Sequence, residues 1–101
     1  MKLIYCTCNV SVIDAFVKRV DELGVDSYQI IEQVLAKSTK GDNRFNTPVW
    51  PGFNSSVVMQ IADEQKAKTI MSAIREFNQK AFNDNELVIA AMLPMDDFCC
   101  D

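Results

Sequence analysis

The hydrophobic and polar positions of this 101-residue chain fall into six blocks, four with strand character and two with helical spacing. The strand blocks are short runs rich in β-branched, aromatic and aliphatic residues, and they cover residues 2–8, 28–37, 56–61 and 86–93. The order strand, helix, strand, strand, helix, strand is that of a ferredoxin-like fold, a split βαβ unit repeated twice. We therefore predict an α+β domain of βαββαβ order, with an antiparallel sheet and two helices on one face. The second and third strands are expected to pair as a hairpin.

Each helical block presents one apolar stripe. In the first block, Ser11 and Asp14 resemble a capping box, and the helix is expected to end before Gly24. In the second block, Asp63 is the predicted N-cap. The stripe residues are Ile13, Phe16, Val17, Val20 and Leu23 in the first helix, and Ala67, Ile70, Met71, Ile74, Phe77 and Ala81 in the second. Both helices therefore have a face to bury against the sheet.

The first and last strands are apolar on both sides. A sheet with helices on one face should alternate apolar and polar residues if its other face meets water. In the last strand, Leu87, Ile89, Ala91 and Leu93 alternate with Val88, Ala90 and Met92; in the first, Leu3, Tyr5 and Thr7 alternate with Ile4, Cys6 and Cys8. The pattern predicts contact with a second protein surface, most economically another copy of the chain. Edge pairing and face-to-face packing both fit, and the pattern leaves the number of subunits open.

Length and charge narrow the class of protein. The chain is long enough for one domain, and with 49% hydrophobic residues it reads as globular. The net charge of −4 disfavours nucleic-acid binding, because phosphate contacts need a basic surface. The first residues lack the pattern of a signal peptide, and no stretch approaches the roughly 20 apolar residues that span a bilayer. We predict a cytoplasmic protein that does not span a membrane, with reduced cysteines.

The segment between the second and third strands is the main candidate for ligand contacts. We place a loop at residues 38–55, within a single domain of residues 1–101 that ends in an acidic, cysteine-containing tail at 95–101. The candidate ligand-binding residues are Lys37, Lys40, Arg44, Trp50, Gly52 and Asn54. Trp50 lines a ligand cleft in one interpretation and packs on a neighbouring subunit in the other. The three cations either meet a small anion or form a solvated surface.

Three segments resemble the PII-like family, trimeric ferredoxin-like relatives of the nitrogen regulatory protein P-II. They are Val49–Ser55 before the third strand, the opening Met1–Ile4, and Leu23–Ile30 from helix end into strand. The resemblance implies a homotrimeric, non-enzymatic signalling protein. It also implies that residues 38–54 correspond to the loop that contacts partner proteins, often a membrane transporter. Effectors in this family bind between neighbouring subunits, beneath that loop.

The chain departs from classical P-II at three positions where the resemblance would place nucleotide chemistry or modification. Its loop has no tyrosine, and its tail is acidic where a basic segment is expected. Residues 82–86, Phe-Asn-Asp-Asn-Glu, replace a glycine-rich, basic phosphate segment. Phosphate binds free backbone N–H groups and positive charge, and this turn offers neither glycine nor a cation. Classical nucleotide sensing is therefore disfavoured, and the sequence does not indicate which cofactor, if any, the protein binds.

The four cysteines define an alternative class, a soft-metal-responsive binding protein. Cys6 and Cys8 lie on the same side of one strand, and Cys99 and Cys100 lie in the acidic tail. If the tail folded back, these thiolates could hold zinc or copper(I), but the spacing is not that of a zinc motif. For Cys6 and Cys8, buried small hydrophobes are the simpler interpretation. Cys99 and Cys100 remain the candidate metal ligands.

An enzymatic role is disfavoured by what the chain lacks. It contains no histidine, the commonest general base. The acylphosphatase variant of this fold would need an arginine after the first strand, where the chain has Asn9-Val10-Ser11. The metal-transporting variant would need a Cys-x-x-Cys in the same place. We therefore predict a protein that is not an enzyme.

Overall fold

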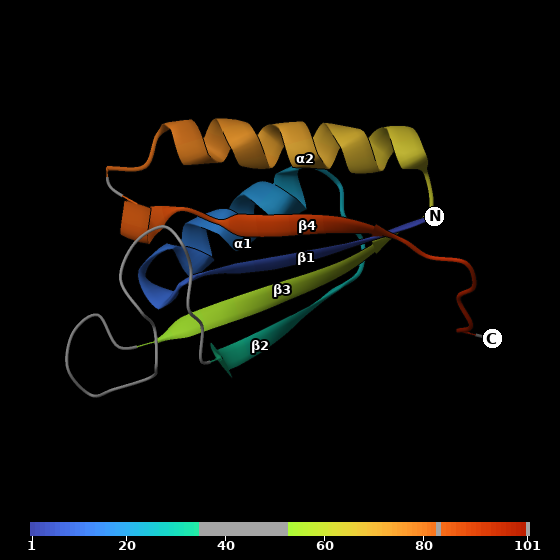
Figure 1. Cartoon of the computed structure of the whole chain (residues 1–101), viewed down its shortest axis with the longest axis horizontal. Helices are drawn as coiled ribbons and strands as arrows, with labels where there is room; N and C mark the ends of the chain where they lie inside the picture. The colour runs from blue at the N-terminus through green and yellow to red at the C-terminus, as the bar shows by residue number, and fades with distance from the viewer. Residues whose placement is uncertain (35–52, 83, 101) are drawn as a thin grey trace.

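A computed structural model describes residues 1–34, 53–82 and 84–100. Its strands and helices are β1 (Lys2–Asn9), η1 (Val10–Val12), α1 (Ile13–Glu22), β2 (Tyr28–Val34), β3 (Asn54–Ile61), α2 (Glu64–Gln79), η2 (Asp84–Glu86) and β4 (Ile89–Pro94). The strands form one antiparallel sheet in the order β2-β3-β1-β4 (Figure 1). The predicted α+β, ferredoxin-like architecture is confirmed, as is the pairing of the second and third strands. Within the described residues, no helix is long and apolar enough to cross a membrane.

The core lies between the sheet and the two helices. From the sheet it takes alternate residues of the central strands, Ile4, Cys6, Cys8, Val57, Met59 and Ile61. From the helices it takes Phe16, Val20, Ala67, Ile70 and Ile74. Phe16 and Phe77 meet edge to face with ring centroids 5.6 Å apart, which joins α1 to α2. The predicted stripes thus face one side of the sheet, and neither α1 nor α2 covers the other side.

The start of the first helical segment differs from the prediction. Ser11 does not cap it; the Asn9 side-chain Oδ1 accepts a 2.8 Å hydrogen bond from the Ser11 backbone N–H. Asn9 therefore caps the short helix η1, and α1 follows from Ile13 without a side-chain cap at Val12. The capping-box interpretation was wrong because β1 runs one residue further than expected and places Asn9 at the turn. Gly24, at φ 78°, closes the other end of α1 in the left-handed conformation that glycine favours.

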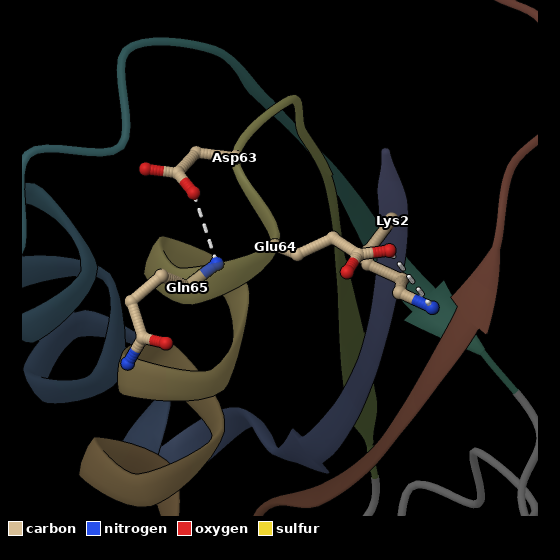
Figure 2. Close-up of polar contacts among 4 residues, drawn as sticks. All are labelled: Lys2, Asp63, Glu64 and Gln65. Carbon is tan, nitrogen blue, oxygen red and sulfur yellow. Dashed lines mark hydrogen bonds and ion pairs between the residues drawn. The ribbon is translucent and has the colours of Figure 1, made fainter.

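The start of α2 follows the prediction. The Asp63 carboxylate accepts a 2.9 Å hydrogen bond from the backbone N–H of Gln65, which satisfies one of the free donors of the first turn (Figure 2). Next to it, Lys2 of β1 and Glu64 form an ion pair at 3.7 Å (Figure 2). Glu64 is largely exposed, so this pair adds little stability. Its position ties the first strand to the first turn of α2.

The last strand begins later than predicted. Residues 84–86 form the 3-10 turn η2, and β4 starts at Ile89 rather than at residue 86. In between, the Asn78 side chain holds the backbone of Val88: its amide donates to the Val88 carbonyl at 2.9 Å, and its oxygen accepts from the Val88 N–H at 2.7 Å. Val88 is 2% exposed, so these bonds satisfy two buried backbone groups. The Asn78 side chain of α2 thus makes the two backbone hydrogen bonds that a neighbouring strand would otherwise make with Val88.

Candidate ligand site at the loop end of the sheet

The sheet face away from the helices, which we call the open face, carries several large apolar side chains. Its rows follow from the register: Leu3 lies between Gln60 and Leu93, and Tyr5 lies between Val58 and Ala91. The large apolar residues left exposed on it are Tyr5 (39%), Ile31 (44%), Ile89 (49%) and Leu93 (44%). The prediction that β1 and β4 are apolar on both sides is therefore confirmed. Exposed apolar side chains gathered on one face are typical of an interaction surface.

The open face becomes polar where β1 ends and β3 begins. Thr7 and Ser56 lie opposite each other, and their hydroxyl oxygens are 3.1 Å apart in a hydrogen bond. One row further, Asn9 lies opposite Asn54, and both are buried, at 4% and 5% exposure. The backbone ladder continues past them, because the Val10 N–H donates to the Phe53 carbonyl at 2.9 Å. Two amides and two hydroxyls therefore gather at one end of the face.

Asn54 differs from Asn9 in having no side-chain hydrogen bond to any described residue. Among the described residues, its side chain makes no hydrogen bond, although it carries an acceptor oxygen and two donor hydrogens. The Asn9 side chain, by contrast, uses its oxygen to cap η1. A buried polar group without a partner costs about 1–3 kcal/mol, so its presence needs an explanation. The arrangement can offer neutral N–H donors and a carbonyl acceptor to a small ligand.

The other predicted ligand-binding residues are not placed by the structure. Lys37, Lys40, Arg44, Trp50 and Gly52 all lie outside the described residues. Their roles therefore stay predictions. Asn54 and Ser55 were expected at the end of the 38–55 loop and instead begin β3, so this strand starts earlier than predicted. The Ser55 hydroxyl donates to the Glu32 carbonyl at 2.8 Å, beside the irregularity in the β2–β3 register.

The turn after α2 has the geometry of a carboxylate cap rather than a phosphate cradle. The side chain of Glu86 accepts a hydrogen bond from the backbone N–H of Phe82 at 3.2 Å. A backbone donor that a phosphate would need is thus already paired with an anion. Phe82 itself is 93% exposed. The geometry agrees with the inference that this segment lacks the chemistry of a glycine-rich phosphate loop.

The cysteines separate into two environments. Cys6 and Cys8 are in the core, at 0% and 3% exposure, and burial raises the pKa of each thiol to about 12. They are thus small hydrophobic side chains, as the simpler interpretation held. Cys99 and Cys100 are exposed in the tail. Within the described residues, no three His, Cys, Asp or Glu side chains come together as a metal site. The assignment of Cys99 and Cys100 as metal ligands stays a prediction.

Sequence reasoning missed Asn9 and a groove beside β2. Asn9 was treated as part of a loop, although the polar Asn-x-Ser start of a helix could have indicated its capping role. The groove lies between α1 and the edge strand β2, and its walls come from segments more than ten residues apart. No local pattern predicts it, because it depends on how far α1 reaches across the sheet.

Comparison with known proteins shows which solved structures share this fold. No family model matches the sequence, and no curated protein matches it by sequence. Solved structures do match, and they are PII-like signalling proteins. At identities below 25%, these matches establish the fold, so the resemblance seen in the sequence is confirmed at that level.

Three of the similar structures show the extent of the match. A protein assigned as PII-like signalling from Thermus thermophilus is 22% identical, with a TM-score of 0.63 over 91% of this chain and 83% of its own. CPII from Thiomonas intermedia, bound to ADP, AMP and bicarbonate, is 12% identical, with a TM-score of 0.68 over 91% and 84%. The same protein with ADP, AMP and acetate gives 14% identity and a TM-score of 0.63 over 95% and 88%.

Proposed function

We propose that this protein is a PII-like signalling protein, a non-enzymatic regulator that acts as a homotrimer. The observation that carries the proposal is the open face, an apolar surface on the side of the sheet that neither α1 nor α2 covers. Burying the exposed half of each large apolar residue would contribute about 1 kcal/mol to the free energy of assembly, and this contribution is repeated in every subunit. The fold shared with PII-like signalling proteins supports the assignment to that class.

The effector is proposed to bind at the polar end of the open face, in the cleft that a neighbouring subunit would complete. Asn54 would provide its buried amide there, next to the ends of the 38–55 segment. A small ligand with both donors and acceptors satisfies such a group and removes the penalty of its burial. CPII has been captured with ADP, AMP, bicarbonate and acetate, which makes these four compounds the first candidates.

The regulatory step is proposed to be a shift between conformations. Residues 38–55 join β2 to β3 at the polar end, so an effector bound there would favour one arrangement of that segment. A partner protein that binds this arrangement alone would then respond to the effector concentration. By analogy with PII-like proteins, we place the partner among membrane transporters and other regulated proteins. Catalysis is not proposed, because the chain has no histidine.

Assembly is tested first, by light scattering on the purified chain. We expect about three times the 11.4 kDa mass of one chain. Ile89→Lys places a charge on the open face and should produce a monomer, because an unpaired charge at a buried interface is costly. Ser72→Lys adds the same charge on the exposed side of α2 and should leave the mass unchanged. A wild-type monomer at micromolar concentration would refute the assembly and the clefts with it.

Effector binding is tested by thermal shift with ADP, AMP, bicarbonate and acetate, each alone and in pairs. We expect at least one to raise the melting temperature of the wild type and to leave Asn54→Leu unaffected. Copper(I) and zinc form a second arm, compared with the Cys99→Ser/Cys100→Ser variant. A response to metal alone, abolished in that variant, would replace the proposed effector class with the soft-metal alternative.

A further inference from the structure

A groove runs between α1 and the edge strand β2, on the helix side of the sheet. The side chain of Ile30 faces this side, since it lies opposite the core residue Val57, yet it is 45% exposed. On this side of β2, Tyr28 packs against the core and its hydroxyl donates to Asp21 of α1 at 2.9 Å, whereas Ile30 is left half exposed. The groove has a volume of about 420 Å³ and is lined by Val10, Ile13, Asp14, Val17, Ile30, Glu32, Gln33 and Phe53. Its size is in the range of small-molecule sites, about 300–1,000 Å³.

Most of the groove wall is aliphatic or aromatic. Val10, Ile13 and Val17 follow one another at helical spacing and form one wall. Ile30 provides the opposite wall, and Phe53 lies where the chain enters β3. Val10 on one wall is 43% exposed and Ile30 on the other is 45% exposed, so both walls keep apolar surface in contact with water. A hydrocarbon chain or ring that entered the groove would remove apolar surface of both partners from water.

The two charged groups among the described residues that line the groove are both negative. Asp14 comes from the first turn of α1 and Glu32 from β2, and no described lysine or arginine lines the groove. Among the described residues, neither carboxylate is in an ion pair or a side-chain hydrogen bond. The positive end of α1 is nearby, but it is equivalent to only about half a charge against two full negative charges. These two carboxylates favour a cation over an anion beside them.

We propose that this groove binds a small organic amine, a compound with a hydrocarbon chain or ring and one protonated amino group. The apolar part lies against Val17 and Ile30, and the ammonium meets the carboxylates of Asp14 and Glu32. Charge-assisted hydrogen bonds of this type are about twice as strong as neutral ones. The site is separate from the proposed effector cleft, because it lies on the helix side of the sheet and the cleft on the open face.

The test compares three probes of one shape on the full ¹⁵N-labelled chain by NMR titration. Phenethylamine is the cation, 2-phenylethanol the neutral compound and 3-phenylpropanoate the anion. We expect phenethylamine to shift the amides of residues 10–17 and 30–33, and to bind at least about tenfold more tightly than the alcohol. The anion should not bind. Glu32→Gln, at an exposed strand position outside both helices, should weaken the amine at least several-fold and leave the alcohol unchanged.

Two variants complete the test. Asp14→Asn with Glu32→Gln should abolish the preference for the amine over the alcohol, whereas Glu76→Gln on the exposed side of α2 should preserve it. Equal binding of amine and alcohol by the wild type would reduce the groove to a nonspecific apolar surface and overturn the proposal. So would wild-type amine affinity in the double variant, shifts at other residues, or no shifts at millimolar phenethylamine.

Discussion

The reactivity of Cys6 and Cys8 gives a quantitative test of the core and of the metal alternative. Alkylating reagents attack the thiolate, not the thiol. Burial raises the pKa of both side chains from 9.0 to about 12, and for Cys6 the neighbouring Cys8 adds a smaller effect of the same sign. At pH 8 the thiolate fraction of Cys6 and Cys8 is therefore about a thousandfold smaller than that of a thiol of ordinary pKa. Exclusion of the reagent from the core slows the reaction further.

The assay is timed alkylation of the native protein with iodoacetamide, read by peptide mass spectrometry. Cys6 and Cys8 should react at least about a thousandfold more slowly than a small-molecule thiol, and should become reactive in urea. The Cys99→Ser/Cys100→Ser variant should therefore keep its unmodified mass under native conditions. Rapid native alkylation of Cys6 or Cys8 would refute their burial and would return them to the set of available metal ligands.

Three further predictions concern stability and the polar end of the sheet. Asn78→Ala should lower the free energy of unfolding in urea by about 2–5 kcal/mol, because two backbone groups of the buried Val88 lose their partners; Gln79→Ala should be nearly neutral. The pKa of Cys6 and Cys8 is raised in the folded state, so their contribution to stability is complete below pH 9 and is lost between about pH 9 and 12. Over that range the free energy of unfolding should fall by up to about 2.7 kcal/mol per pH unit for the two thiols together. The Cys6→Ala/Cys8→Ala variant should lack this slope in pH-dependent unfolding. Asn54→Leu should leave the melting temperature without effector equal or higher, since it removes a buried amide that has no partner among the described residues, and a clear loss of stability would contradict that account.

The Asn54 prediction separates a functional role from a structural one. A buried residue that only supports the fold should destabilise the protein when its polar group is lost. A residue kept for a ligand should instead show a gain in stability and a loss of effector response. Measuring both quantities on the same variant therefore decides between the two roles.

Local patterns in the sequence were sufficient for the fold. The period of apolar residues placed both helices and the faces of β1 and β4, because one side of each element must be buried for the domain to be stable. Asp63 was recognised as a cap because the hydrogen bond it accepts is only two residues away. These features depend on contacts within a few residues, so their prediction required no knowledge of the three-dimensional arrangement.

Contacts between distant segments decided the rest. The late start of β4 follows from Asn78, which binds the backbone of Val88 from another element. Asn54 is buried opposite Asn9, far earlier in the chain, and the groove is lined together by residues of η1, α1 and β2 and by Phe53. The sequence determined which side of each element is apolar, since that depends on side-chain spacing alone. Only the tertiary structure decided which polar groups are buried and what they meet there, because those are properties of the whole arrangement.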